Sequence, residues 1–167
     1  MPTASQVLLE EHKSIRAVVD PAIAAGEDIS RRGPAAIALH HVSLSALADV
    51  LTGDLSRHSA KEDEIYFPAI ERALGSSQGP TAVMRAEHRQ IHASGEGFRQ
   101  LLAELPAEEA ASTPEAAHAL ADRLRELGDL IDAHFEKEEV ILFPMADSVL
   151  PPEENSALGD RLKNYRG

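Results

Sequence analysis

Two stretches of this chain repeat one another without a gap. Residues 58–68 read HSAKEDEIYFP and residues 134–144 read HFEKEEVILFP, so a histidine, a lysine, a glutamate, a phenylalanine and a proline recur at the same places. A Glu-His pair lies upstream of each stretch at the same distance; the pairs are Glu11-His12 and Glu87-His88. The sequence therefore predicts one helical hairpin written twice, with an offset of 76 residues from 58 to 134.

The second copy carries polar side chains on an apolar stripe. Steps of three and four residues, typical of the inward face of a bundle helix, connect Leu120, Leu124, Leu127, Ile131, His134, Glu138, Ile141 and Met145. The first copy predicts an equivalent stripe that runs through Leu55, His58, Glu62, Ile65 and Ala69. A carboxylate on an inward face is costly to desolvate unless positive charge lies opposite, and neutral imidazole does not supply it. A bound metal ion does.

Composition limits the kinds of site and partner. A chain of 167 residues suits one domain, and 4% aromatic residues with no tryptophan favour helices over a sheet. The net charge of −12 argues against nucleic acid and anionic membranes as partners. Without cysteine, any metal must be held by histidine and carboxylate. We find no leader-like segment and no stretch of transmembrane length, so we expect a cytoplasmic location.

Turn and cap signals divide the chain into four long helices. We expect them from Thr3 or Ser5 to about Gly26, from Pro34 to about Leu74, from Pro80 to about Leu105, and from Ser112 or Thr113 to about Val149. Connections are expected at 29–33, 75–80 and 106–113, and Pro21, Gly53 and Pro68 are possible interruptions. The fold class is all-α. Residues 1–150 are expected to form an up-down-up-down four-helix bundle, with 151–167 as a tail or a short fifth helix packed on it.

The doubled motif predicts a metal site inside the bundle. A histidine and a glutamate four residues apart lie about 40° apart around a helix, so both can reach one ion. One such pair alone is more often a solvated ion pair, but four histidines at doubled spacing on apolar stripes favour a metal. The expected ligands are His12, His58, Glu62, His88, His134 and Glu138. Six ligands suit two ions, and mixed imidazole and carboxylate ligation favours iron or manganese, with zinc left open.

Other polar residues near the motifs are weighed individually. His92 lies one turn after His88 and could bind the same ion, although its repeat-mate, Arg16, cannot; we include it as a seventh candidate beside the alternative of a partly buried histidine near the site. Tyr66 follows Glu62 by one turn, and core packing with a hydrogen-bonded hydroxyl is favoured over ligation.

The remaining histidines and acidic neighbours are not assigned to the site. His40, His41 and His118 lie several turns away. The carboxylates beside the motifs are expected either on solvated faces or as hydrogen-bond partners of the ligands; they are Glu11, Glu64, Glu87 and Glu139.

These motifs together resemble the hemerythrin-like (HHE cation-binding) domain family over roughly residues 5–150. The resemblance implies a four-helix bundle around a non-haem di-iron centre bridged by oxygen and carboxylates. Oxygen-carrying members add a fifth histidine, which His92 matches, and usually have an aspartate five residues after the last histidine. Here that position is Glu139, and Glu138 stands at the four-residue spacing, as in hemerythrin-like proteins that are not simple oxygen carriers. The ferritin-type alternative needs two Glu-x-x-His motifs, and only Glu115 to His118 has that spacing.

Three functions follow from such a centre. The first is reversible binding or sensing of O2 or NO. The second is an enzyme that decomposes hydrogen peroxide, as catalases do, or NO. The third is iron delivery or iron–sulfur cluster repair, which is less favoured because such repair proteins carry an additional cysteine-bearing N-terminal region. In each case the partner is a small ligand such as O2, NO or H2O2, and whether there is also a protein partner is left open.

Overall fold

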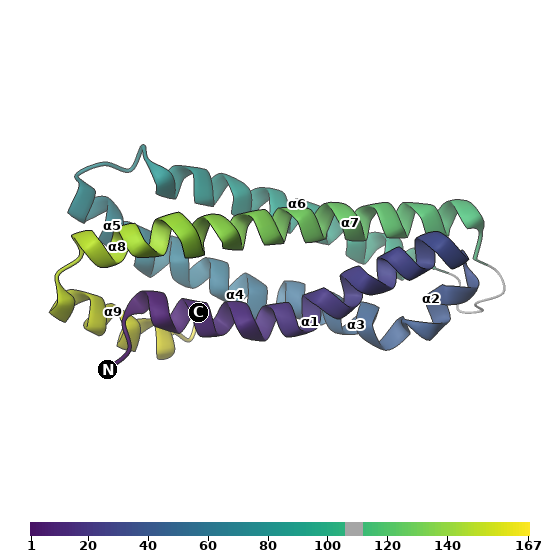
Figure 1. The fold of residues 1–167 in the computed structure, drawn as a ribbon, viewed down its shortest axis with the longest axis horizontal. Helices are drawn as coiled ribbons and strands as arrows, with labels where there is room; N and C mark the ends of the chain where they lie inside the picture. Colours follow the sequence, from purple (N-terminus) through teal and green to yellow (C-terminus); the bar gives the residue numbers. More distant parts are fainter. Residues whose placement is uncertain (106–111) are drawn as a thin grey trace.

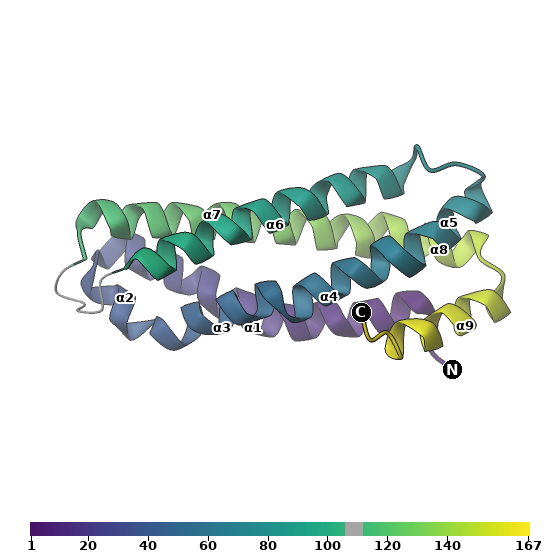
Figure 2. The ribbon, with the colours of Figure 1, turned by 180° about the vertical axis from the view of Figure 1, so that it is seen from behind.

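Long helical columns run antiparallel and form an elongated bundle (Figures 1 and 2). The computed structural model describes residues 1–105 and 112–167, so most of the expected connection at 106–113 lies outside the described residues. The elements are α1 (Ala4–Arg32), α2 (Ala35–Leu39), α3 (His41–Thr52), α4 (Asp54–Lys61), the π-helix η1 (Glu62–Tyr66), α5 (Phe67–Leu74), α6 (Pro80–Glu104), α7 (Pro114–Lys137), the π-helix η3 (Glu138–Leu142), α8 (Phe143–Val149) and α9 (Pro152–Lys163). The predicted all-α class is confirmed.

The first column is longer than expected because α1 continues past Gly26 to Arg32. It begins at Thr3, whose side chain accepts a hydrogen bond from the Gln6 N–H in a capping box, and it runs through Pro21 without ending. Gly26 does not end the helix but lies where α1 contacts α7. A Cβ at this position would lie 3.0 Å from Leu124 Cβ, so the absence of a side chain lets α1 approach α7 closely. The helix ends at Gly33, whose φ of 76° suits glycine.

The second column is interrupted, whereas the sequence predicted one helix to about Leu74. Gly53 separates α3 from α4 with φ −101° and ψ −99°. The third column, α6, closely follows its prediction. In the fourth, α7 starts after Thr113, which caps the Ala116 N–H.

Both metal-motif helices contain a π-helical turn that begins at the motif glutamate. The Phe67 N–H donates to the Glu62 carbonyl and the Phe143 N–H to the Glu138 carbonyl, in place of i−4 partners. A proline follows each turn, and because proline has no N–H it cannot continue the ladder of i−4 hydrogen bonds. The duplicated Phe-Pro therefore marks two equivalent widened turns.

The widened turns correct the predicted inward stripe. Beyond Glu138 the stripe was expected through Ile141 and Met145, but Ile141 is 59% exposed, and Leu142 and Ala146 are buried instead. In the first copy Tyr66 and Ile70 are likewise fully buried and Ile65 is only partly buried, while Ala69 is buried as predicted. One extra residue in each turn rotates the register that regular α-helical counting predicts.

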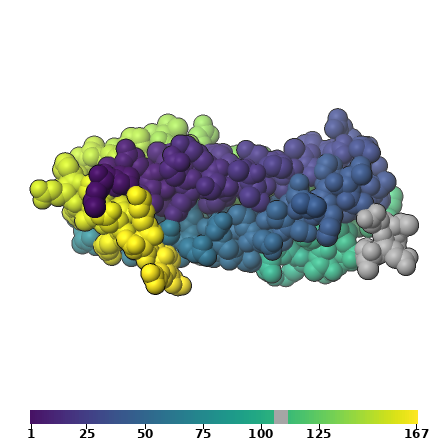
Figure 3. Space-filling view, turned by 90° about the horizontal axis from the view of Figure 1, so that it is seen from below, coloured from purple at the N-terminus to yellow at the C-terminus, as the bar shows by residue number. Residues whose placement is uncertain are grey.

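Two apolar clusters fill the bundle, one on each side of the motif residues. The larger contains Ile15, Leu55, Ile91 and Ile131, and the smaller contains Leu8, Phe67, Met84 and Leu142, so each motif histidine lies between members of both. Helix α9 adds Leu158 and Leu162 to the smaller cluster and lies against the start of α1 (Figure 3). Within residues 1–105 and 112–167, none of the helices combines the length and apolar character that crossing a bilayer requires.

Candidate metal centre

Four histidines, one from each column, turn their Nε2 atoms toward two glutamates between the columns. His12 Nε2 lies 3.1 Å from Glu138 Oε2 and 3.1 Å from His58 Nε2. His88 Nε2 lies 3.2 Å from Glu62 Oε2. Within each motif, the Nε2 to carboxylate distance is 3.4 Å, for His58 with Glu62 and for His134 with Glu138. All six side chains are at most 3% exposed.

The six residues divide into two sets of four that share both glutamates. One set is His12, His58, Glu62 and Glu138, and the other is Glu62, His88, His134 and Glu138. In each set, four ligand atoms lie within 4.8 Å of one another. Each repeat therefore supplies two histidines and one glutamate to its own set, and the same glutamate also belongs to the other set. This is a suitable arrangement for two neighbouring cations bridged by carboxylates.

Unsatisfied atoms show that a cation fits here. Both carboxylate oxygens of Glu62 and of Glu138, and Nε2 of His88 and His134, are buried and find no hydrogen-bond partner among the described residues. Buried polar atoms are normally paired, and a buried carboxylate is costly without a compensating charge. The donor set is nitrogen and carboxylate oxygen, which fits iron, manganese or zinc.

The pKa shifts of the two glutamates also show that their buried charges are unfavourable without a cation. Burial raises the pKa of Glu138 well above its usual range, and the neighbouring Glu62 raises it further. Burial also opposes ionisation of Glu62, but His58 and His88 outweigh it and lower the pKa of Glu62 to about 2. Two carboxylates this close cannot both ionise cheaply, so one holds the proton that a cation would displace.

Each histidine is oriented by a carboxylate on its other ring nitrogen. His12 Nδ1 lies 2.8 Å from Glu139 and His88 Nδ1 lies 3.1 Å from Asp63, and these two carboxylates are one repeat apart. In the same way, His58 Nδ1 lies 2.9 Å from Glu11, and His134 Nδ1 lies 3.0 Å from Glu87. A carboxylate at Nδ1 holds the proton there and leaves the Nε2 lone pair free for a metal.

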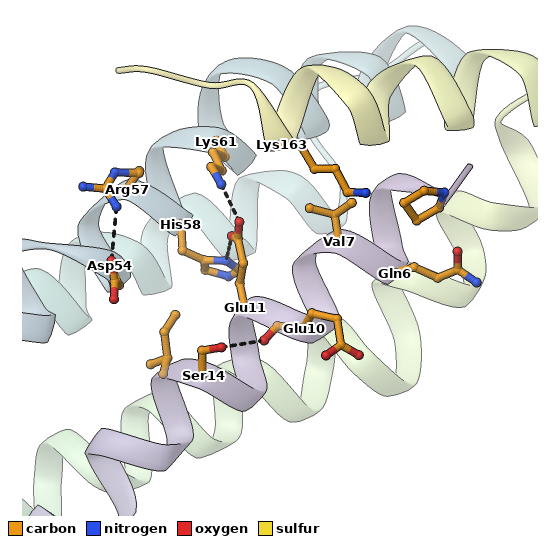
Figure 4. Close-up of a pocket in the computed structure, with 12 residues that line it drawn as sticks. Gln6, Val7, Glu10, Glu11, Ser14, Asp54, Arg57, His58, Lys61 and Lys163 are labelled. Carbon is orange, nitrogen blue, oxygen red and sulfur yellow. Dashed lines mark hydrogen bonds and ion pairs between the residues drawn. The ribbon is translucent and has the colours of Figure 1, made fainter.

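Basic residues complete this outer layer. Lys61 pairs with Glu11 and Lys137 with Glu87, while Arg16 lies 3.4 Å from Glu139 and Arg85 lies 3.3 Å from Asp63. Figure 4 shows Glu11 between His58 and Lys61. They lie on the wall of a groove of about 710 Å³, and its other lining residues include Val7, Asp54, Arg57 and Lys163.

Aromatic rings separate the histidines from solvent. Phe135 stacks on His12 with ring centroids 3.7 Å apart and an interplanar angle of 9°. Phe67 stacks on His88 at 5.6 Å, and Phe143 lies 5.5 Å from His12. These rings give the centre a dry, apolar boundary.

The seventh candidate, His92, is not brought to the centre. It is exposed and belongs to neither set of four. The inward face of α6 is centred between His88 and Ile91. Position 92 lies beyond His88, about 100° around the helix from Ile91. His92 therefore lines the side of the bundle near Gly95 and not its interior.

Other sequence expectations have clear outcomes. Tyr66 is buried with its hydroxyl hydrogen-bonded to Ser5 Oγ at 2.8 Å, as expected. His40 pairs with Asp28 at 2.8 Å, away from the centre. Asp63 was missed as a partner of His88, although its repeat relation to Glu139 was a usable signal.

Comparison with known proteins agrees with this geometry. The sequence matches the hemerythrin HHE cation-binding domain over residues 3–146, and a second match covers residues 96–164. The chain belongs to this family. It is 34% identical over 105 residues to the iron–sulfur cluster repair protein YtfE of Yersinia pseudotuberculosis serotype IB (strain PB1/+), and 33% identical over the same length to YtfE of Yersinia pestis strain Pestoides F. These alignments cover 62% of this chain and 46% of each relative, so they extend over less than half of the relatives' length.

Proposed function

We propose that this hemerythrin-like chain holds two iron ions between Glu62 and Glu138 and serves in iron delivery for iron–sulfur cluster repair. The observation that carries the di-iron proposal is the pair of four-residue sets that share both glutamates. The similarity to YtfE proteins of two Yersinia species supports the repair role over the other functions expected from the sequence.

The chain's own residues would keep the ions available and protected. Nδ1-bound carboxylates hold the four imidazoles in one tautomer, so ligands do not need to reorganise when an ion binds. Phe135 and Phe67 exclude water from His12 and His88. When bound, a pair of iron ions supplies one- and two-electron redox chemistry and coordination positions for small molecules.

The groove between α1 and α4 supports a role in which iron leaves the protein. Its wall includes His58, whose Nδ1 pairs with Glu11, and Glu11 is in turn held by Lys61 (Figure 4). Movement of Glu11 and Lys61 would uncover one ligand from the groove without opening the apolar core.

Iron content is the first test. Protein expressed with added iron and purified anaerobically should contain close to two irons per chain by elemental analysis. A content of one or below, or retention of zinc in preference to iron, would contradict the di-iron proposal.

Transfer of iron is the second test. Iron-loaded protein labelled with ⁵⁷Fe should restore the activity of a [4Fe–4S] dehydratase damaged by NO, and the label should appear in the repaired cluster. A metal-free sample of the same protein is the control. Equal reactivation by free ferrous iron at the same concentration would argue against a specific repair role.

Binding of a small ligand is the second candidate function. Each set offers four protein atoms, so an iron with six-fold coordination would keep positions open for O2, NO or peroxide. Stopped-flow absorbance of the anaerobically reduced iron protein, mixed separately with each, separates the functions. A stable O2 or NO adduct favours binding or sensing, and oxygen evolution from peroxide favours a catalase-like enzyme.

A further inference from the structure

Tyr66 begins a directional hydrogen-bond chain that leads from the interior to the surface. Its ring is fully buried, and its hydroxyl lies 2.8 Å from Ser5 Oγ. Ser5 in turn donates to Asp147 Oδ1 at 2.9 Å, and Asn155 Nδ2 donates to the same oxygen at 2.8 Å. Because the Ser5 hydroxyl donates its one hydrogen to Asp147, the Tyr66 hydroxyl is the donor in the hydrogen bond to Ser5. The chain ends at a carboxylate whose residue is exposed.

Packing alone does not require this hydroxyl. The repeat-mate of Tyr66 is Leu142, which is 1% exposed and fills the equivalent place beyond Glu138 with an apolar side chain. A leucine thus suffices for the core in one half of the molecule. The phenol with its proton acceptor is present only in the other half, which points to a use for the hydroxyl.

Aromatic contacts connect Tyr66 to both halves of the metal centre. Its ring lies 5.9 Å from Phe143, which is 5.5 Å from His12, and 6.4 Å from Phe67, which is 5.6 Å from His88. The chain has neither cysteine nor tryptophan, and its only other tyrosine is Tyr165. Tyr165 is bonded to Glu64 near the C-terminus and is only partly buried. Tyr66 is therefore the one readily oxidised phenol beside the centre.

We propose that Tyr66 is an electron donor to the centre, a role that rests on the proposed di-iron site. The oxidant is hydrogen peroxide, and the step applies when one of the two irons is already ferric. Cleavage of the peroxide O–O bond would take up two electrons, and two protons from solvent, to give two waters. A ferrous ion held by the centre would supply one electron, and Tyr66 would supply the other and become a neutral phenoxyl radical.

The hydrogen-bond chain provides for the proton of that step. Burial raises the pKa of Tyr66, so the phenol keeps its proton until it is oxidised. Once an electron leaves, a protonated radical would be a positive charge in an apolar site, which is unfavourable. The phenolic proton moves to Ser5 Oγ as Ser5 passes its own to Asp147, so the charge leaves with the electron. Asp147 at the surface returns the proton to solvent.

Freeze-quench EPR with parallel Mössbauer spectroscopy tests the proposal. The ⁵⁷Fe-loaded protein is half-reduced without oxygen and mixed with one equivalent of peroxide. We expect a tyrosyl radical in the parent protein and in Tyr165→Phe, and its loss to background in Tyr66→Phe. Ser5→Ala, which keeps the phenol but removes its acceptor, should lower the radical yield, and circular dichroism verifies that each variant remains helical.

The outcomes separate this proposal from the one it rests on. A radical of equal yield in Tyr66→Phe overturns the assignment. So does the absence of a radical in the parent when Mössbauer spectra show that peroxide has oxidised both irons. If elemental analysis of the Mössbauer sample gives one iron per chain or fewer, the di-iron proposal itself fails. Ring-deuterated tyrosine, which narrows the hyperfine structure only of a tyrosyl radical, must change the signal for the proposal to stand.

Discussion

Glu138 and Glu139 are adjacent in the sequence but have different places in the centre. Glu138 is fully buried and belongs to both ligand sets, whereas Glu139 belongs to neither and lies 2.8 Å from Nδ1 of His12 and 3.4 Å from Arg16. We expect Glu138→Gln to weaken the binding of both ions, because it removes the charge that they share. Glu139→Gln should affect one ion only, and changes of this outer kind typically cost about 10- to 100-fold in metal affinity.

These affinities convert into changes of thermal stability. At a fixed iron concentration, a loss of about 10- to 100-fold removes roughly 1.4–2.7 kcal/mol of ligand stabilisation. In a domain of this size, each kcal/mol shifts Tm by about 2–4 °C, so Glu139→Gln should lower the Tm of the iron-loaded protein by about 3–10 °C. Glu138→Gln should abolish most of the rise in Tm that iron produces.

The metal-free proteins should show the opposite order. Burial and Glu62 raise the pKa of Glu138, so its ionised form destabilises the metal-free fold, and a neutral amide removes that cost. Glu138→Gln should therefore unfold at a higher temperature than the parent when both lack metal. Glu139→Gln, which loses contacts with His12 and Arg16, should not.

Thermal unfolding followed by circular dichroism, with and without ferrous iron under anaerobic conditions, measures both effects, and elemental analysis accompanies it. Equal loss of iron in the two variants would mean that the helix presents residue 139 to the ions. A Tm of metal-free Glu138→Gln below that of the metal-free parent would mean that the charge of the buried Glu138 carboxylate does not destabilise the metal-free fold. Either result would refute the reasoning.

Three further changes test separate parts of the structure. His92→Ala should leave iron content and absorption unchanged, because His92 is exposed and outside both sets; loss of an ion would restore it as a ligand. Phe135→Ala should cost about 3–5 kcal/mol in urea unfolding, as expected for a fully buried phenylalanine, and a cost below 1 would deny its packing on His12. Burial lowers the pKa of His88, but Asp63 and Glu62 outweigh it and raise the pKa to about 9. Protonated His88 should therefore stabilise the metal-free fold below pH 6.5, and this contribution is lost as the pH rises through 9. Equal unfolding midpoints of the metal-free protein at pH 6.5 and 9.5 would contradict this prediction.

The sequence predicted the bundle and the convergence of six side chains because both follow from periodicity. His12, His58, His88 and His134 lie on apolar stripes, and a stripe must face the core wherever its helix is regular. The doubled spacing then places the four at one level of the bundle. Ser112 or Thr113 as a cap and Pro80 as a helix start were equally local signals, and the structure uses Thr113 and Pro80.

What the sequence could not supply depends on departures from regular geometry and on contacts between columns. The burial of Leu142 in place of Ile141 follows from a π-helical turn, which regular α-helical counting does not include. The pairing of Asp63 with His88 joins two columns, so no spacing within one helix indicates it, and the repeat relation of Asp63 to Glu139 was the one signal that pointed to it. His92 lies outside both ligand sets for a related reason: it is only about 40° from His88 around the helix, but on the side away from the centre of the buried face.

The sharing of Glu62 and Glu138 has a consequence for how such a chain could arise. Each hairpin gives its two histidines to one ligand set and shares its glutamate with the other, which is the reciprocal contact pattern of a two-fold symmetric dimer. A single hairpin that paired with a second copy of itself would thus have held the same centre before the gene was duplicated. The π-helical turn occurs at the same place in both halves, so such a single hairpin would already have contained the extra residue. Differences such as Tyr66 opposite Leu142 would then have arisen after a fusion, when the two halves became free to diverge.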